Sequence, residues 1–327
     1  MEAVKKDKNV ELRWPVDSSY PDVSTREKAS TIWHELIESA HNSAEPGVLF
    51  WDTAKKATPS DAYADEGFGS TSTNPCGEII LSPYDSCRLM LMNLTSFVEN
   101  PWTEESEFNF GLFAEKVQKA QRLMDDMIDL EIEQIRDIIK KIDSDSEPGE
   151  VKKIERDLWV NIEAQAQRGR RTGLGITGLG DMLAMLGVTY GSSDAIVMTE
   201  EVYKWLALNS YESSIVMAKE RGSFPVWDHE KEGDHPFISR IVSELLPHRQ
   251  EDYKKYGRRN IANTTTAPAG SVSVLTQTTS GIEPAFMLHY MRRKKLTGQD
   301  LDDRVDFVDD SGDKWQEYTV YHHGFNQ

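Results

Sequence analysis

The sequence lacks the features of membrane and secreted proteins. No segment approaches the roughly 20 consecutive apolar residues of a membrane-spanning helix, and charges occupy the place of a signal peptide's apolar core. We therefore expect a cytoplasmic protein with no membrane partner. Cysteine is also scarce, because the 327 residues include only Cys76 and Cys87. Two thiols cannot form the disulfide framework of a small secreted domain, and the Cys and His spacing does not match a zinc site, so we expect no metal.

Basic residues are few relative to acidic ones. The chain has 37 Lys+Arg and 55 Asp+Glu, which gives a formal net charge of -18. A chain this acidic repels the phosphates of nucleic acids and of anionic lipids, so we expect no polynucleotide partner. A local phosphate-binding pocket remains compatible with this charge.

The hydrophobic pattern predicts an α/β protein. Apolar spacing and helix-breaking residues predict helices over residues 24–42, 110–142, 149–167, 176–186 and 194–221. Short apolar runs predict strands over residues 47–51, 261–266 and 271–275, with a polar loop over 54–73. Alternation on both sides of Ser311-Gly312 predicts a hairpin of residues 304–308 and 315–320. Strands separated by helices favour mostly parallel pairing, with the hairpin as an appendage.

The segment after the polar loop carries three groups suited to catalysis. In an extended segment, Asn74, Cys76 and Glu78 would share one face, with Pro75 and Gly77 directed away from it. A thiol that attacks or abstracts, a carboxylate that moves a proton and an amide that orients a substrate would suit an enzyme. The alternative is a buried cysteine in a turn made by Asn-Pro and Gly.

The second cysteine, Cys87, follows the sequence Ser82-Pro83-Tyr84-Asp85-Ser86. A returning loop could place its sulfur near Cys76 or near a cysteine elsewhere, where it could donate electrons and end as a disulfide. The alternative is an unreactive core cysteine.

A loop of small and hydroxyl residues runs from Thr264 to Ser273. Its glycine lets backbone N–H groups approach an anion, and amides at the start of a helix would add to a phosphate site. The segment from Thr278 to Pro284 could form a second tight turn at the same site. The alternative is a pair of ordinary Ser/Thr-rich loops.

The residues from Gly173 to Gly178 match the G-x-G-x-x-G consensus of dinucleotide-binding proteins. That motif should follow a strand, and here a predicted helix end and the basic turn Arg170-Arg171 precede it. Close packing around small residues is therefore the better interpretation.

Several segments together resemble one family, the catalytic subunit of ribonucleotide reductase. The resemblance lies in Asn74-Pro75-Cys76-Gly77-Glu78 with Tyr84-Asp85-Ser86-Cys87, Arg170 to Gly175 with Gly178 to Asp181, Ala267 to Ser271, and Ser280 to Pro284. These motifs occur in the family's order over most of the chain. The short interval between the two cysteines and the passage from Met291 to Asp310 look most like the adenosylcobalamin-dependent class II enzymes.

The resemblance implies a ten-stranded α/β barrel with an active-site finger loop, of which this chain supplies about half, plus a C-terminal β-hairpin. It implies a single catalytic-barrel portion over 1–327, with a lead and helix at 1–45, barrel strands and helices at 46–290 and a hairpin extension at 291–327.

The resemblance also implies roles for the site residues. Cys76 would form a thiyl radical that abstracts the ribose 3′-hydrogen, Glu78 would take the 3′-hydroxyl proton, and Asn74 would bind the ribose. Cys87 would be one member of a pair that closes to a disulfide as water leaves. The substrate phosphates would lie on Pro268, Ala269, Gly270, Ser271, Val272 and Ser273. Adenosylcobalamin would be the cofactor, although no self-contained cobalamin motif is visible.

The chain lacks the family's sequence before the region matching Val48, which holds the first barrel strands and the partner of Cys87. We expect a naturally split, oligomeric enzyme whose N-terminal half is a separate chain, with an excised fragment as the alternative. Its substrate would be a ribonucleotide. A thioredoxin-like or other dithiol would reduce the disulfide formed in the reaction. The competing functions are a class I reductase large-subunit fragment and an inactive binding or regulatory remnant.

Overall fold

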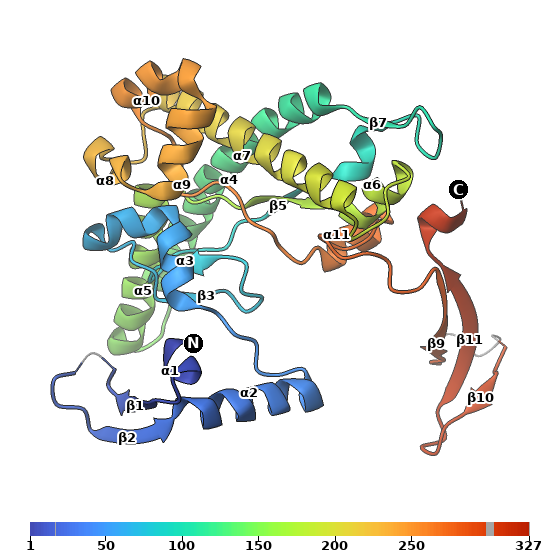
Figure 1. The fold of residues 1–327 in the computed structure, drawn as a ribbon. Helices are drawn as coiled ribbons and strands as arrows, with labels where there is room; N and C mark the ends of the chain where they lie inside the picture. Colours follow the sequence, from blue (N-terminus) through green and yellow to red (C-terminus); the bar gives the residue numbers. More distant parts are fainter. Residues whose placement is uncertain (17, 299–303, 327) are drawn as a thin grey trace. The chain divides into compact units, whose positions relative to one another are not determined.

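The computed structural model describes residues 1–16, 18–298 and 304–326. The chain forms two units, Met1–Ala54 and Lys55–Gln327 (Figure 1). Every helix among the described residues is too short or too polar to span a bilayer.

The first unit is a small two-stranded sheet with helices. Strands β1 (Asn9–Trp14) and β2 (Val23–Lys28) pair antiparallel, and helices α1 (Glu2–Lys5) and α2 (Ala29–Ser43) complete the unit. The predicted helix over 24–42 therefore begins five residues late, because residues 24–28 pair with β1. The strand predicted over 47–51 is wrong. Residues 45–50 have no regular structure, and helix α3 spans Trp51–Ala57.

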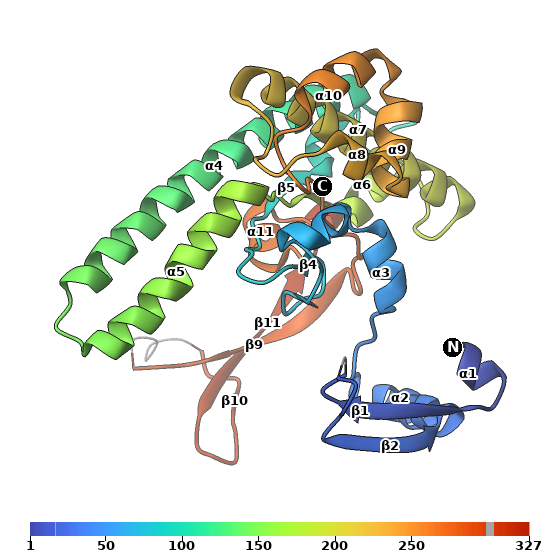
Figure 2. The same ribbon diagram turned by 90° about the vertical axis from the view of Figure 1, so that its left-hand side faces the viewer.

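Three long helices form the frame of the second unit. Helix α4 (Phe110–Ser144) packs against both α5 (Gly149–Gly169) and α7 (Ser193–Arg221), and Figure 2 shows α4 and α5 as an extended antiparallel pair. The Asn109 side chain caps α4 by accepting a hydrogen bond from the Leu112 amide at 2.8 Å. Buried residues recur along α4 at helical spacing, which confirms the predicted helix. The predicted helices over 149–167 and 194–221 are also confirmed.

A short parallel sheet lies in the core beside these helices. Strand β5 (Met90–Asn93) pairs with β8 (Leu174–Thr177), and Leu174 forms a parallel bridge to Thr264. Two antiparallel hairpins flank this sheet in the sequence: β3 (Ser72–Thr73) with β4 (Ile80–Leu81), and β6 (Val98–Glu99) with β7 (Glu107–Phe108). The α/β class is confirmed, but the expectation of mostly parallel pairing is wrong for the described strands.

Three further predictions need correction. The helix predicted over 176–186 begins later, because Leu174–Thr177 is a strand and α6 spans Leu179–Met185. The strand predicted over 261–266 reduces to the single bridge at Thr264. The strand predicted over 271–275 is helix α11 (Gly270–Thr276), so tertiary context overrides the β propensity of its valines. The loop predicted over 54–73 contains part of α3 and the 3₁₀ helix η1 (Pro59–Glu66).

The C-terminal part is an antiparallel sheet of three strands in the order β10 (Phe307–Val308), β11 (Lys314–Tyr321) and β9 (His289–Lys295). The predicted hairpin is confirmed in its second strand and in the turn, where Gly312 has φ +84°. The first strand is shorter than predicted. Strand β9 was not predicted, because all its residues are exposed and no apolar alternation marks it.

A buried charge pair joins α8 (His229–Gly233) to the segment that follows α10 (Gln250–Tyr256). Further short helices of this unit are η2 (Leu94–Phe97), α9 (Pro236–Ser239), η3 (Arg240–Leu245), η4 (Pro247–Arg249) and η5 (His323–Asn326). The side chains of Arg258 and Glu232 are both fully buried, with an N–O distance of 2.6 Å. Tyr63 and Tyr253 each donate a hydrogen bond to the same carboxylate, at 2.7 and 2.6 Å. Burial alone would raise the pKa of Glu232, but the Arg258 charge and these hydrogen bonds lower it.

Replacing Glu232 with alanine should lower the free energy of unfolding by about 3–5 kcal/mol, because Arg258 would stay buried without a counter-charge. Urea denaturation measures the change. The matched control is Glu201→Ala, which removes the exposed pair with Lys204 and should cost less than about 1 kcal/mol. Equal losses in the two variants would show that the buried pair has no special importance.

Replacing Gly173 or Gly175 with alanine should lower the free energy of unfolding by about 1–3 kcal/mol. A Cβ at Gly173 would lie 2.6 Å from the Arg88 carbonyl oxygen, and one at Gly175 would lie 2.7 Å from the Thr265 carbonyl oxygen. The control is Gly149→Ala, because a Cβ there meets nothing within 4 Å. Thermal unfolding should show a lower midpoint for the first two alanine variants only.

Candidate active site

The predicted catalytic trio lies on the turn between β3 and β4. The Gly77 amide donates to the Asn74 carbonyl at 3.0 Å, and Gly77 has φ +80°. The Asn74 side chain closes the turn by accepting from the Ile79 amide at 3.1 Å. The segment is therefore a tight turn rather than the extended piece assumed from the sequence. Asn74 and Glu78 both reach Cys87 from this folded turn, not from one face of an extended segment.

Two of the four predicted catalytic and redox groups, Asn74 and Glu78, each contact a third, Cys87. The Asn74 Nδ2 atom lies 3.7 Å from the Cys87 Sγ, and that sulfur lies 4.0 Å from the Glu78 Oε1. Cys76 is on the same turn, and both cysteines are free and exposed. The structure thus brings an amide, a carboxylate and a thiol together around the turn that carries Cys76.

Glu78 has one oxygen without a partner. Its Oε2 atom is buried and makes no hydrogen bond within the described chain. The Glu78 backbone carbonyl accepts from the Thr265 hydroxyl at 2.8 Å, which ties the turn to the segment beside β8. A buried carboxylate oxygen with unused acceptor capacity is suited to receive a proton from a bound hydroxyl group.

The surroundings disfavour the thiolate form of Cys87. Partial desolvation raises the pKa of Cys87, and the negative charges of Glu78 and Cys76 raise it further. The Asn74 amide and the Arg88 charge act in the opposite direction but do not cancel these effects. The raised pKa therefore favours the neutral thiol form of Cys87 near neutral pH.

Two buried ion pairs lie beneath the turn, and the sequence analysis missed both. Arg171 pairs with Asp85 at 2.6 Å, and Arg88 pairs with Glu131. The signal in the sequence was the Arg170-Arg171 pair, which was interpreted as a basic turn after a helix end. Both arginines are almost completely buried, which their charge alone did not indicate.

The glycine-rich segment packs closely and does not bind a dinucleotide in the manner of the fingerprint. The strand follows the first glycine instead of preceding it, because Gly173 comes directly before β8 and Gly175 lies within β8. The carbonyl groups of residues 88 and 265 occupy the space that a Cβ at Gly173 or Gly175 would need. The interpretation as close packing is confirmed.

The predicted phosphate loop lies at the start of α11. Ala269 precedes this helix, Pro268, Gly270, Ser271 and Val272 are exposed, and the Ser273 hydroxyl donates to the Gly270 carbonyl at 2.8 Å. The second predicted turn lies against the start of α6, where the Gly178 amide donates to the Thr279 carbonyl at 3.1 Å. The two loops are adjacent, since a Cβ at Gly281 would lie 3.3 Å from the Ala267 carbonyl oxygen.

Asp181 is a second group that sequence reasoning did not single out. Its Oδ2 accepts from the Thr279 amide at 2.8 Å, and its Oδ1 lies 3.4 Å from His322 Nε2. Burial raises the pKa of Asp181, although the Thr279 amide and His322 act against this effect. Asp181 therefore joins the second turn to the segment that follows β11.

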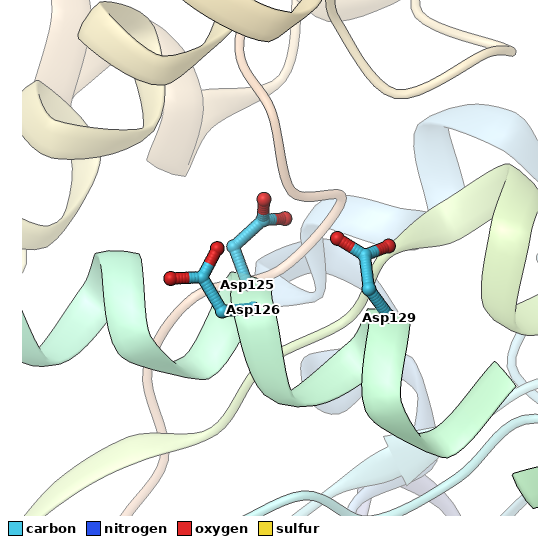
Figure 3. Close-up of side chains that lie close together, drawn as sticks. All are labelled: Asp125, Asp126 and Asp129. Carbon is cyan, nitrogen blue, oxygen red and sulfur yellow. The ribbon is translucent and has the colours of Figure 1, made fainter. Parts of the chain in front are cut away.

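Figure 3 shows a cluster of three carboxylates on α4, Asp125, Asp126 and Asp129, whose oxygens lie within 4.8 Å of one another. Arginines already neutralise this cluster. Asp125 pairs with Arg170 at 2.7 Å and with two other arginines, Arg259 and Arg221. Burial alone would raise the pKa of Asp125, but Arg170 and Arg259 lower it. We interpret the cluster as an ion-pair network that joins α4 to α5 and α7, and we assign it no metal.

Comparison with known proteins agrees with this geometry. Residues 1–310 match the family model described as "Ribonucleotide reductase, barrel domain". A vitamin B12-dependent ribonucleoside-diphosphate reductase of Thermoplasma acidophilum is 31% identical over 285 residues, covering 85% of this chain and 30% of the relative. A reductase of the same description from Mycobacterium tuberculosis is 27% identical and covers 83% of this chain and 31% of the relative.

Relatives of another description are also similar. A ribonucleoside-diphosphate reductase subunit alpha of Chlamydia pneumoniae is 24% identical, covering 83% of this chain and 25% of the relative. The solved structure of the Actinobacillus ureae class Id ribonucleotide reductase alpha subunit shares the fold, with a TM-score of 0.53 and 22% identity over 78% of this chain and 39% of that one. The chain thus spans about 30% of the length of its first curated relatives. It belongs to the ribonucleotide reductase barrel-domain family.

Proposed function

We propose that the chain is the catalytic portion of a ribonucleotide reductase that converts ribonucleotides to 2′-deoxyribonucleotides by thiyl-radical chemistry. One observation carries this proposal. The tight turn that bears Cys76 also gathers Asn74, Glu78 and Cys87 into one cluster of contacts. Family membership over residues 1–310 supports the assignment.

The first step uses the groups on the turn. A Cys76 thiyl radical abstracts the ribose 3′-hydrogen, so an S–H bond forms and the C3′–H bond breaks. The buried Glu78 Oε2 takes the 3′-hydroxyl proton, and this oxygen has no other partner within the described chain. The Asn74 Nδ2 group donates to the ribose, since its Oδ1 is already used by the Ile79 amide.

The second step needs two electrons. The 2′-hydroxyl group leaves as water, and two thiols supply two electrons and two protons while they close to a disulfide. Cys87 is one of these thiols. The other must come from outside these 327 residues, because the only other cysteine is Cys76, which returns the hydrogen to C3′. A thioredoxin-like or other dithiol then reduces the disulfide.

Backbone amides are the proposed phosphate ligands. Residues 268–273 contain no basic side chain, and the first amides of α11 have no partner within the helix. The substrate phosphates would therefore be held by N–H groups on Ala269, Gly270 and Ser271.

The described strands do not close a barrel, so the rest of the barrel is part of the proposal. Beyond the pair β5 and β8, the described parallel sheet continues only as a single bridge at Thr264. Large apolar side chains are also exposed, such as Leu275 at 85% and Phe286 at 92%. Exposed apolar surface of this kind is typical of an interface. We propose that the remaining half, supplied as a separate N-terminal chain, covers it in an oligomeric enzyme.

The radical source is proposed from the relatives alone. The Thermoplasma and Mycobacterium relatives are named as vitamin B12-dependent, which favours adenosylcobalamin. No self-contained cobalamin motif is visible in the sequence, and we assign the cofactor no step or contact on this chain. The Chlamydia and Actinobacillus relatives favour the second candidate, a class I subunit.

Replacing Cys76 with alanine should abolish ribonucleotide reduction, because no other group on the turn can carry the radical. The assay mixes this chain with a polypeptide supplying the remaining half, adenosylcobalamin, a dithiol and a ribonucleotide. Ser72→Ala, on the same hairpin, should leave the rate unchanged. Undiminished product formation by the Cys76 variant would contradict the proposal. Activity only with a radical-generating subunit would favour class I.

Replacing Glu78 with glutamine should lower kcat about 10²–10⁴-fold with a small change in KM, because the amide cannot accept the 3′-hydroxyl proton. Steady-state kinetics in the same assay measure both constants. Glu201→Gln, at an exposed site on α7, is the control. A rise in KM with unchanged kcat would mean that Glu78 only binds the substrate.

A further inference from the structure

The loop that carries Cys87 is held from both sides by charged groups. Asp85, two residues before Cys87, pairs with Arg171 at 2.6 Å, and the two side chains are only 2% and 3% exposed. Arg88, the residue after Cys87, donates to the Arg171 backbone carbonyl at 3.1 Å. The Arg171 side chain therefore anchors the chain before the cysteine, and the Arg171 backbone carbonyl anchors it after the cysteine.

Each anchor is itself supported. Asp85 also accepts from the Ser86 amide at 2.9 Å and from the Ser82 hydroxyl at 3.2 Å. The Arg88 Nη2 atom donates to the Glu131 carboxylate on α4 at 3.0 Å. The anchor formed by Arg88 is therefore also attached to this long helix. Buried charge-assisted hydrogen bonds of this length are stronger and more directional than contacts to sulfur.

The contacts of Cys87 itself are too weak to hold the loop. Its sulfur lies 3.7 Å from the Asn74 amide and 4.0 Å from Glu78. Sulfur is a weak donor and acceptor, so these contacts follow from where the backbone places the thiol. The position of the backbone at residues 85–88 therefore decides whether the thiol lies against Glu78.

We propose that Arg171 is a positioning residue, which holds Cys87 against Glu78 and Asn74 by fixing the chain on both sides of the cysteine. The inference rests on the proposed function for the redox role of Cys87, but the placement itself does not. Within the reaction, a fixed backbone would keep the thiol in reach of the ribose and of the second thiol through every cycle.

The titration of Cys87 reports on this placement. The charged groups that act on the thiol are Glu78 and Cys76, which raise its pKa, and Arg88, which lowers it. Removing the Glu78 charge should therefore lower the pKa of Cys87 only while the thiol lies beside Glu78. The size of this Glu78 effect measures how well the loop is held.

The test is a double-mutant cycle in the full chain, with Cys76→Ser in every protein so that Cys87 is the only thiol. The rate of alkylation by iodoacetamide is followed against pH, since only the thiolate reacts. The cycle combines Glu78→Gln with the neutral replacement Arg171→Gln plus Asp85→Asn. The matched control is Arg170→Gln plus Asp125→Asn, which removes an equally buried pair one residue away.

With Arg171 intact, Glu78→Gln should shift the alkylation midpoint to lower pH and increase the rate below it by about twofold or more. In the Arg171/Asp85 variant the same change should have a clearly smaller effect, because only the anchor before Cys87 is removed and Arg88 still donates to the backbone carbonyl of residue 171. The Arg170/Asp125 control should keep the full effect. Should the Arg171/Asp85 variant fail to fold, Asp85→Asn alone carries the same test, with a reduced Glu78 effect expected.

A full Glu78 effect in folded variants without the Asp85 pair would overturn the proposal, as would its equal loss in the Arg170/Asp125 control. The measurement uses no nucleotide, cofactor or second chain. Its outcome is therefore independent of whether the assembled protein reduces ribonucleotides, and either proposal can fail without the other.

Discussion

The candidate site depends on the close approach of three backbone segments. Residues 88–93, 172–177 and 262–265 run side by side, and any side chain at Gly173 or Gly175 would collide with a neighbouring carbonyl group. This approach brings the Cys87 loop, the arginine that anchors it and the Thr265 hydroxyl into reach of the turn that carries Cys76. The glycines therefore matter for the chemistry although none of them takes part in it.

Charge is distributed unevenly in this acidic chain. Arg88, Arg170, Arg171 and Arg258 are nearly or fully buried, and each pairs with a carboxylate. The chain has a net charge of -18. Because these arginines are buried, their positive charges are not exposed at the surface. An anionic substrate would not be attracted by this surface, so its phosphates must be recognised locally by oriented amides. The proposed phosphate loop, with no basic side chain, agrees with that requirement.

The sequence predicted much of the helical frame but little of the strand pairing. Helix α4 was predictable because its buried residues, from Phe113 to Ile142, follow helical spacing over many turns. Strand β8 was missed because its residues are all buried and include a glycine, so no alternation marks them. Helix α11 was mistaken for a strand because Val272 and Val274 favour strands locally, yet both are exposed on a helix.

The site was partly predictable for a different reason. The period of two pointed to Asn74, Cys76 and Glu78, and a returning loop pointed to Cys87. The structure brings Asn74 and Glu78 into contact with Cys87, but through a tight turn where the spacing implied an extended segment. Partners that come from distant segments, such as Arg171 for Asp85 and Thr265 for Glu78, leave no local pattern in the sequence. These contacts arise from tertiary packing and could be found only in the structure.

The most direct test of this account is the fate of the ribose 3′-hydrogen in the assembled protein. With a 3′-deuterated ribonucleotide, adenosylcobalamin or a radical-generating subunit, and a dithiol, deoxynucleotide formation should be slower than with the protiated substrate and should require Cys76. An equal rate for both substrates in single turnovers, with product still formed by the Cys76→Ala variant, would contradict the assignment of Cys76 as the residue that abstracts hydrogen.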